Sequence, residues 1–390
     1  MISFDNTEIA FKSKSNRDLK RAYWLFKAVG SRTFVKFGKW ATNVAFKLRL
    51  PINGMIKKTI FHQFCGGESV EGSIATSNAL GEHNVKTILD YSIEGKTSDE
   101  DFDSTVAEII ETIETGKVND NIPFAVFKMT GICLFSILEK ANAGIDQLKG
   151  DDLKKYEQLV SRVDQICSAA HACKVPVFID AEESWIQDTI DRITKEMMLR
   201  YNKESAIVYN TLQMYRHDRL AFFQEEIDSA KADGHHYGVK IVRGAYMEKE
   251  RERAEEKGYP SPIQPTKEAS DSDFNKSLRL SLDNLDIVDL CAGSHNEKSA
   301  MLLTEIMTEK NVPNNHASIY FAQLLGMSDH ISFNLANAGY NVAKYVPYGP
   351  VKEVMPYLLR RADENTSVAG QTSRELSLIM KERKRRKGKK

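Results

Sequence analysis

Eight short apolar runs recur along the chain, and each is followed by a longer segment with helical periodicity. They are VKTILDYS (85–92), FAVFKMTG (124–131), VPVFIDAEES (175–184), SAIVYNTLQM (205–214), GVKIVRGAY (238–246), LDIVDLCAGSHN (285–296), ASIYFAQLLG (317–326) and NVAKYVPYG (341–349). Regular alternation of this kind predicts parallel strands joined by crossover helices. With 390 residues, 42% of them hydrophobic, the chain is long enough to bury the core that such a sheet needs.

The number of repeats selects the architecture. Eight strand–helix units match a (β/α)8 TIM-type barrel, whose usual size is about 250 residues. A doubly wound sheet uses the same alternation, but its dinucleotide fingerprint, G-x-G-x-x-G after the first strand, is absent. We therefore predict an α/β protein with a helical N-terminal arm (1–84), a (β/α)8 barrel (85–370) and a C-terminal helix end with a basic tail (371–390).

Polar or charged residues end nearly every predicted strand. They are Asp90, Lys128, Asp180, Gln213, Arg243, Ser294–His295–Asn296, Gln323 and Tyr345. In a (β/α)8 barrel the chemistry gathers where the strands end. A ring of such residues therefore predicts a polar mouth with a bound ligand.

Two of these strand ends suit a large, anionic, heteroaromatic cofactor. In VRGAY a glycine follows the strand arginine, which allows the backbone to approach a ligand closely. AGSHN offers a hydroxyl, an imidazole and an amide in succession, although His295 alone would more often be a structural histidine. We predict no metal site, because no His-x-x-x-His or carboxylate-rich cluster is present.

Two adjacent arginines, Arg360 and Arg361, lie on an amphipathic helix predicted over residues 349–365, after the eighth strand. One interpretation is a solvated helix face with an Arg360–Glu364 pair. The other is recognition of a substrate carboxylate by two guanidinium groups at the barrel mouth, together with Lys128. The residues alone therefore predict a barrel enzyme with a small anionic substrate.

The formal net charge is zero, but basic residues gather at both ends of the chain. Residues 12–58 hold thirteen Lys/Arg and one acid, and residues 381–390 hold eight and one, which leaves 33 basic against 50 acidic residues in 59–380. The first basic segment also contains the aromatic residues Trp24, Phe26, Phe34, Phe37, Trp40 and Phe46. We predict peripheral contact of 12–58 and 381–390 with anionic lipid. Packing of the rings on the body, and a disordered solubilising tail, are the alternatives.

Several classes of protein are disfavoured by simple counts. No run of about 18 apolar residues is present, and the N-terminus lacks the order of a signal peptide. The five cysteines form no C-x-x-C and suit reduced, mostly buried thiols. We predict a cytoplasmic protein, peripheral at the inner membrane face. A non-catalytic barrel that binds nucleic acid through its basic ends is a remote alternative, because no recognised nucleic-acid module is present, and we predict no such partner.

Eight strings, in order, resemble the proline dehydrogenase family, from about Phe61 to Val368. They are FCGGES (64–69), FKMTG (127–131), FIDAEES (178–184), YNTLQMY (209–215), VKIVRGAY (239–246), CAGSHN (291–296), KYVPYG (344–349) and YLLRRADEN (357–365). The chain resembles the monofunctional, FAD-dependent form, since no second, aldehyde-oxidising domain follows. The resemblance implies a distorted (β/α)8 barrel with the flavin over the strand ends and the last barrel helix over the active site.

The resemblance also implies roles for individual residues. The FAD contacts it implies are Ala181, Gln213, Lys240, Arg243, Gly244, Ala245, Tyr246, Ser294, His295, Asn296 and Glu364. The substrate contacts are Lys128, Arg360 and Arg361 for the carboxylate and Tyr345 and Tyr357 for the ring. Asp180, Lys240 and Tyr345 form the catalytic set. Glu68 and Arg360 are expected to pair as a gate, and Glu364 to brace the arginine pair.

The implied reaction is oxidation of L-proline to 1-pyrroline-5-carboxylate, the first step of proline catabolism to glutamate. A hydride leaves C5 for FAD, and the electrons pass on to a membrane quinone. Tyr345, packed near C4 of the substrate, favours proline over hydroxyproline. The alternatives are a hydroxyproline dehydrogenase or another flavin barrel that oxidises an amine or reduces a folate.

Overall fold

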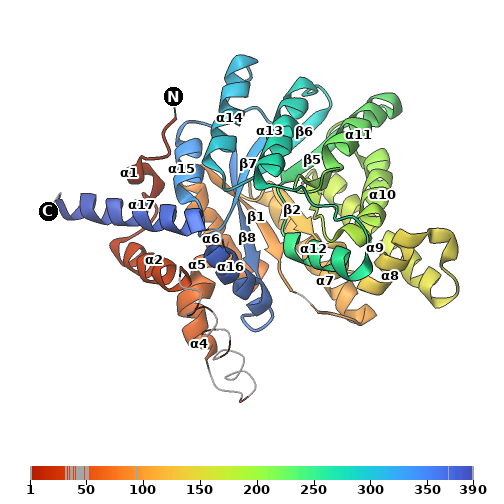
Figure 1. Ribbon diagram of the computed structural model, residues 1–390, viewed down its shortest axis with the longest axis horizontal. Helices are drawn as coiled ribbons and strands as arrows, with labels where there is room; N and C mark the ends of the chain where they lie inside the picture. The colour runs from red at the N-terminus through yellow and green to blue at the C-terminus, as the bar shows by residue number, and fades with distance from the viewer. Residues whose placement is uncertain are drawn as a thin grey trace. The chain divides into compact units, whose positions relative to one another are not determined.

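The computed structural model describes residues 2–30, 52–93, 95–367 and 369–388 and isolated positions between 31 and 51; within 362–372 it describes the backbone alone. Eight strands form one closed sheet in chain order, which confirms the predicted (β/α)8 barrel (Figure 1). The strands are β1 (Val85–Tyr91), β2 (Phe124–Phe127), β3 (Val177–Ile179), β4 (Val208–Gln213), β5 (Tyr237–Val242), β6 (Val288–Gly293), β7 (Ile319–Leu324) and β8 (Val342–Tyr348). Seven of them lie within one of the eight apolar runs, and β5 begins one residue before its run.

Helices precede, connect and follow the strands. The longer ones are α2 (Asn16–Val29), α6 (Val70–Gly81), α7 (Asp99–Val118), α8 (Phe135–Ala143), α9 (Asp151–Cys173), α10 (Ser184–Tyr201), α11 (Arg219–Asp233), α12 (Met247–Lys257), α13 (Lys267–Asp283), α14 (Glu297–Glu309), α15 (Asp329–Asn337), α16 (Met355–Ser367) and α17 (Ala369–Gly388). The short ones are α1 (Thr7–Ala10), α4 (Asn53–Ile56), the π-helix η1 (Lys57–Phe61), α5 (His62–Phe64) and the 3-10 turns η2 (Met129–Gly131) and η3 (Ile145–Gln147).

The chain forms two compact units, and each is described by itself. Unit 1 comprises Met1–Glu94 and Gln323–Lys390, and unit 2 comprises Gly95–Ala322. In unit 2, parallel pairing sets Thr211 of β4 and Cys291 of β6 level with Lys240 of β5. In unit 1, Ile88 of β1 pairs with Tyr345 of β8.

An aromatic cluster lies inside unit 2. Phe124 of β2 stacks on Phe178 of β3, with ring centroids 4.7 Å apart. The rings of Tyr209 on β4 and Tyr320 on β7 meet Phe124 edge-on, at 5.8 and 4.8 Å. Side chains from four strands thus meet in one close-packed group, as expected for a barrel whose interior is filled rather than open.

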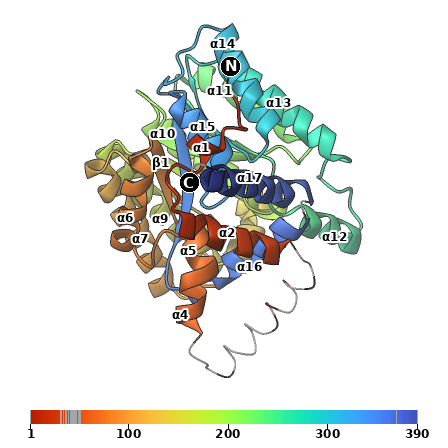
Figure 2. The ribbon, with the colours of Figure 1, turned by 90° about the vertical axis from the view of Figure 1, so that its left-hand side faces the viewer.

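The terminal segments of unit 1 contact each other. Ser15 caps α2, where it and Asp18 form a reciprocal capping box. Figures 1 and 2 both show α17 beside α1 and α2. Apolar residues of the three helices pack together, including Ala10, Phe26 and Leu378.

The basic tail predicted over 381–390 is helical as far as Gly388. Several of its cations contact the N-terminal segment. Arg386 donates to the carbonyl oxygens of Phe11 and Lys14, both at 2.8 Å, and Arg385 pairs with Glu8 at 3.0 Å. The alternative of a disordered tail is therefore wrong for 381–388, because these charges have protein partners.

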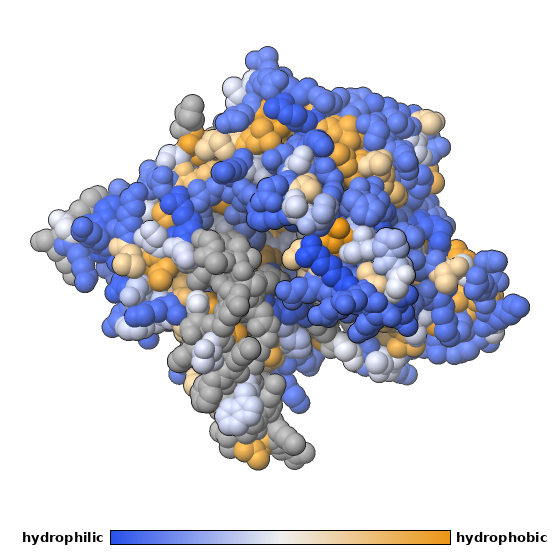
Figure 3. All heavy atoms as spheres, in the orientation of Figure 1, coloured by the Kyte–Doolittle hydropathy of each residue, from blue (hydrophilic) through white to orange (hydrophobic). Residues whose placement is uncertain are grey.

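One face of the molecule is mainly polar. Figure 3 shows hydrophilic side chains over most of the face drawn, with hydrophobic ones in separate groups. Among the described residues, no helix combines the length and the apolar character needed to cross a membrane. All five cysteines are free thiols and all but Cys173 are buried, as predicted.

Candidate active site

Three charged side chains form a row of ion pairs in unit 2, two of them directly after a strand and one within β5. Asp180, directly after β3, pairs with Lys240 of β5 and, at 3.2 Å, with Lys128 directly after β2. The ammonium group of Lys240 also lies 5.2 Å from the ring centroid of Phe178 in the aromatic cluster. Side-chain exposure rises from 6% at Lys240 through 13% at Asp180 to 30% at Lys128. Two cations thus share one carboxylate, and the outer cation reaches solvent.

Gln213, at the end of β4, links this group to the loop after β5. Its amide nitrogen donates to the carbonyl oxygen of Glu182 at 2.8 Å, and its amide oxygen accepts from the backbone N–H of Ala245 at 3.4 Å. Ala181 is half-buried between Asp180 and Glu182. The side chain of Gln213 is 3% exposed, so it fixes the spacing between two loops.

Gly244 has a structural reason to be glycine. Its φ is +132°, where other residues are strained, and a Cβ atom there would lie 2.5 Å from the ring of Tyr215. The close approach inferred from the sequence is therefore made, within the protein, to a tyrosine ring. Ala245 is exposed and Tyr246 half-buried, just before α12.

Arg243 joins the ends of β5 and β6. It pairs with Asp271 at 2.5 Å and donates to the hydroxyl oxygens of Ser294 (2.8 Å) and Ser299 (2.9 Å). Burial outweighs the pairing with Asp271 and lowers the pKa of Arg243. A guanidinium group has five N–H donors, and these three bonds leave two for a ligand.

The loop after β6 leads into the N-terminus of α14. Asn296 caps this helix, with its amide oxygen accepting from the backbone N–H groups of Lys298 (2.9 Å) and Ser299 (3.3 Å). Ser294 accepts from the backbone N–H of Asn296 at 3.1 Å, and His295 between them is half-buried. The positive end of a 13-residue helix therefore lies beside the Arg243 contacts.

The remaining predicted residues belong to unit 1. Tyr345 lies in β8 and is 9% exposed, and Tyr357 lies in α16 and is 6% exposed. The Arg361 guanidinium lies 5.1 Å from the ring centroid of Tyr357, and Arg360 is exposed. Glu364 belongs to α16, but its side chain falls outside the described residues, so its bracing role stays a prediction.

Helix α16 begins at Met355, whereas the sequence predicted a helix from residue 349. Residues 351–353 form a turn instead, and Val351 and Val354 pack with Phe64 and Leu358. Pro356 then occupies the first turn of the helix, where a missing N–H costs no intrahelical bond. The helix start predicted from the sequence was therefore wrong.

Glu68 pairs with Lys57 of the π-helix η1. It lines a cavity of about 420 Å³ together with His62, Cys65 and Gly67, among others. The expected pairing of Glu68 with Arg360 stays a prediction. A π-turn is rare and is often found near functional sites, which makes the segment before FCGGES notable.

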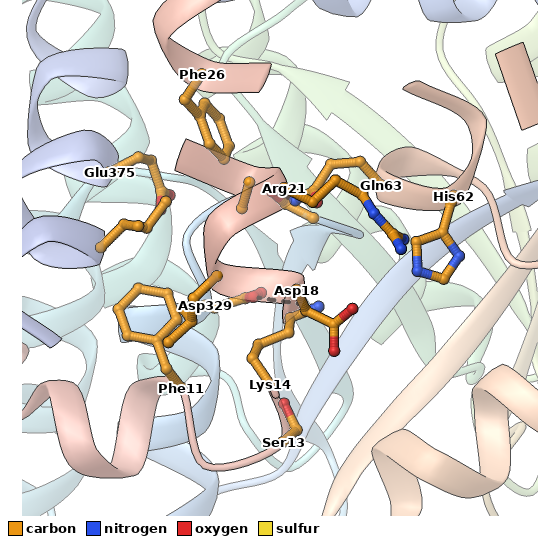
Figure 4. Close-up of a pocket in the computed structure, with 14 residues that line it drawn as sticks. Phe11, Ser13, Lys14, Asp18, Arg21, Phe26, His62, Gln63, Asp329 and Glu375 are labelled. Atoms are coloured by element: carbon orange, nitrogen blue, oxygen red, sulfur yellow. Dashed lines mark hydrogen bonds and ion pairs between the residues drawn. The ribbon is translucent and has the colours of Figure 1, made fainter. Parts of the chain in front are cut away.

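A second cavity of unit 1, of about 140 Å³, contains none of the predicted site residues (Figure 4). Lys14, Arg21 and His62 are among its basic lining residues, and Asp18, Asp329 and Glu375 are the acidic ones. Burial and the nearby Arg21 lower the pKa of His62. The charges of both signs on its wall are largely balanced.

Two groups of buried charges were missed from the sequence. Glu182, 3% exposed, accepts hydrogen bonds from Thr130. Lys344, fully buried in β8, pairs with Asp329 at 2.9 Å. The only sequence signal for Lys344 was a lysine inside an otherwise apolar strand, and Glu182 was one of three acids in DAEES.

Comparison with known proteins supplies a family. A family model described as "Proline dehydrogenase" matches residues 73–374. Proline dehydrogenase 1, mitochondrial, from Dictyostelium discoideum is 32% identical over 98% of this chain and 74% of that protein. Hydroxyproline dehydrogenase from Xenopus laevis is 30% identical over 99% of this chain and 90% of that protein.

A solved structure resembles the fold. Proline utilization A (PutA) from Bdellovibrio bacteriovorus superposes with a TM-score of 0.72 over 92% of this chain, at 20% identity. The present chain spans 38% of that much longer protein. At this identity the likeness supports the barrel architecture.

Proposed function

Because the chain belongs to the proline dehydrogenase family, we propose that it oxidises L-proline to 1-pyrroline-5-carboxylate with FAD as cofactor. The observation that carries the proposal is the row of ion pairs formed by Lys128 after β2, Asp180 after β3 and Lys240 within β5. Positive charge in excess of negative charge, open to solvent on one side, suits a substrate with a carboxylate. Proline is such a substrate.

The residues present fit a flavin dinucleotide. Arg243 retains two N–H donors beside the N-terminus of α14, and this combination suits a diphosphate. When bound, FAD supplies a two-electron acceptor for the hydride that leaves C5 of proline. Gln213, Ala181, Gly244, Ala245, Tyr246, Ser294, His295 and Asn296 are the other residues of unit 2 that we assign to cofactor binding.

The residues of unit 2 have three tasks in this proposal. Lys128, the outer and more exposed cation of the three-residue group, binds the substrate carboxylate. Lys240 faces the reacting end as the inner cation, and Asp180 holds both ammonium groups in position. Fixing these charges before the substrate arrives lowers the cost of orienting it.

The residues of unit 1 are assigned from the family motifs. Arg360 and Arg361 are proposed to bind the carboxylate through their planar guanidinium groups. Tyr345 and Tyr357 contribute ring contacts, and Tyr357 already supports Arg361 by stacking. Glu68, now paired with Lys57, and Arg360 are proposed to close the site when substrate is bound.

Substrate choice has a second candidate. The resemblance to a hydroxyproline dehydrogenase keeps 4-hydroxyproline open as a substrate. The nearly buried ring of Tyr345 favours proline, because a hydroxyl on C4 would need space beside it.

We further propose a quinone as electron acceptor and peripheral contact with anionic lipid through the N-terminal segment. Trp24 and Met55 are 57% and 63% exposed, and the ammonium of Lys27 lies 5.3 Å from the Trp24 ring centroid. Phe26 is buried instead, and Phe34, Phe37 and Phe46 lie outside the described residues. Co-sedimentation with vesicles of anionic lipid should weaken as salt rises, and binding independent of salt would contradict the electrostatic version.

The decisive test is an absorbance spectrum of the purified protein, repeated without oxygen after L-proline is added. We expect a flavin band that is lost with L-proline and kept with D-proline. A band that stays oxidised with L-proline but bleaches with 4-hydroxyproline would favour the second candidate. A colourless protein that cannot be reconstituted with FAD would contradict the proposal.

A further inference from the structure

Glu182 is a buried acid two residues after Asp180, and its carboxylate contacts the end of β2. The backbone N–H of Thr130 donates to Oε1 of Glu182 at 3.1 Å, and the Thr130 hydroxyl donates to Oε2. Thr130 lies in η2, two residues after Lys128. The side chain is thus bound at both oxygens to the segment that carries the outer cation.

The backbone of Glu182 is fixed as well. Its N–H donates to the side-chain oxygen of Gln187 at 2.9 Å, and its carbonyl oxygen accepts from Gln213 at 2.8 Å. Glu182 therefore joins the ends of β2, β3 and β4 in unit 2. The Lys128–Asp180 ion pair also links the segments after β2 and β3, and the backbone N–H of Asp180 donates to the carbonyl oxygen of Phe127 at 2.9 Å.

We propose that Glu182 is a positioning residue that holds Lys128 at the correct distance from Asp180 for binding of the substrate carboxylate. The inference rests on the proposed function, since it assigns Lys128 to a carboxylate ligand. Glu182 does so through Thr130, without touching the substrate. A lysine on a four-carbon stem is mobile, so its placement depends on the backbone from which it extends.

The charge of Glu182 has a second effect on the same cation. Burial raises the pKa of Glu182 to about 7, while the Thr130 hydrogen bonds and Lys128 oppose that rise and Glu183 adds to it. Glu183 is itself paired with Lys249. Below pH 7 Glu182 is neutral and Lys128 keeps its full positive charge toward a ligand. Above pH 7 the ionised carboxylate partly neutralises it, so an anionic ligand binds more weakly.

The two effects are separated by two substitutions. Glu182→Ala removes both hydrogen bonds, whereas Glu182→Gln keeps an acceptor for the Thr130 N–H and an amide that can donate to its hydroxyl oxygen. Glu250→Gln is the matched control, because Glu250 is equally buried and accepts from the N–H and hydroxyl of one residue, Ser184, both at 2.6 Å. Thr130→Val provides a milder loss of one bond if Glu182→Ala does not fold.

The ligand for the binding test is tetrahydrofuran-2-carboxylate, the oxygen analogue of proline, which has no nitrogen to titrate. Calorimetry on the flavin-loaded protein should give a Kd about tenfold higher for Glu182→Ala than for the wild type at pH 7. We expect KM for proline to rise by a similar factor, with kcat within about twofold. Glu182→Gln should restore the wild-type Kd at pH 6.

The pH dependence of Kd distinguishes a role of Glu182 in positioning Lys128 from a role in stabilising the fold alone. Between pH 6 and pH 8 the wild-type Kd should rise about threefold, and in Glu182→Gln it should stay constant. Glu250→Gln should keep the wild-type profile. An unchanged Kd in Glu182→Ala or Thr130→Val, or a slope that persists in Glu182→Gln, would overturn the proposal.

A measurement that needs no substrate distinguishes a failure of the positioning role of Glu182 from a failure of the proposed function. In the infrared band of protonated carboxylic acids, one component should disappear in the wild type as pH rises through about 7, and that component should be missing in Glu182→Gln. If that band titrates but no carboxylate ligand binds the wild type, the proposed function is wrong. If the ligand binds equally to all variants, Glu182 has no positioning role.

Discussion

Two buried lysine–aspartate groups invite comparison. The Asp180 cluster (Lys128, Asp180 and Lys240) lies in unit 2, and the Asp329 cluster (Lys344, Asp329, His330 and Glu375) lies in unit 1. In each, a strand lysine pairs with an aspartate that follows a strand: Asp180 lies directly after β3, and Asp329, after β7, is the first residue of α15. Sequence alone would give both the same description.

The clusters differ in how their charges are satisfied. Lys344 is completely buried and also donates to the carbonyl oxygens of Met327 (2.5 Å) and Leu324 (3.4 Å). Burial raises the pKa of Asp329, but Lys344 and Lys14 outweigh it and hold that pKa below its usual value. Lys128, by contrast, is 30% exposed beside an aspartate that Lys240 already neutralises. We therefore interpret a fully enclosed pair as structural, and a pair joined by a second, more exposed cation as suited to a ligand.

The largest effect should come from breaking the closed cluster. Lys344→Met leaves Asp329 buried beside no strand lysine, and such a loss typically costs about 3–5 kcal/mol. Urea unfolding at pH 7 should show this decrease in the free energy of unfolding. The double variant Lys344→Met/Asp329→Leu should recover most of it, and a single-variant loss below about 1 kcal/mol would contradict the comparison.

Asp180→Asn should reduce activity rather than stability. Loss of one preorganised charge near a reacting substrate typically costs about 100-fold in rate, so kcat/KM for proline per bound flavin should fall by about that factor. Asp329→Asn is the control, with kcat/KM within about threefold of the wild type despite lower stability. Equal activity losses in the two variants would remove the distinction between the clusters.

Tyr345, which follows Lys344 in β8, offers a test with a smaller expected effect. Tyr345→Ser should raise the ratio of kcat/KM for 4-hydroxyproline to that for proline by about tenfold, because it opens space for a hydroxyl group. Steady-state kinetics with both substrates measures the ratio. Tyr345→Phe keeps the ring and should leave the ratio unchanged, and an unchanged ratio in Tyr345→Ser would count against the substrate assignment.

The smallest expected effect concerns pH. Burial raises the pKa of Glu375 against the opposing influence of His330. A carboxyl whose folded pKa lies above its unfolded value loses stabilising free energy as pH rises from about 4.5 through the folded pKa. Glu375→Gln should therefore gain Tm relative to the wild type between pH 5 and pH 8, by about 2–4 °C. A difference in Tm that does not change with pH would contradict this assignment.

The sequence predicted the barrel and much of the site because both depend on local signals. The carboxyl ends of the strands of a parallel barrel lie at the same face, so naming the polar residues that end the predicted strands identified Lys128 and Asp180. The Lys240–Asp180 contact needed the family resemblance and the pairing register. Glu182 was missed because burial of one acid among three in DAEES depends on the neighbouring β2 end, which no local pattern records.

Long-range contacts were equally invisible in the sequence. The basic tail was expected to meet lipid phosphate or solvent, yet Arg386 and Arg385 contact Phe11, Lys14 and Glu8. Burial of Glu382 opposes its ionisation, but hydrogen bonds from Arg385 and Arg386 outweigh it and lower the pKa of Glu382 to about 2. Charge counts show how many cations a segment has, and only the fold shows which of them remain available.

The contacts between α17 and the N-terminal segment also determine how late during translation the N-terminal helices can be buried. Arg374 and Lys381 bind Asp5 across 369 and 376 residues of sequence. At about 5–20 residues per second, a ribosome needs roughly 20–75 s to make that interval. During this time the apolar face of α2 that includes Phe26 is not yet covered by Leu378 and Ile379. We therefore expect this face of α2, although synthesised early, to be buried late and to be a binding site for chaperones while translation continues.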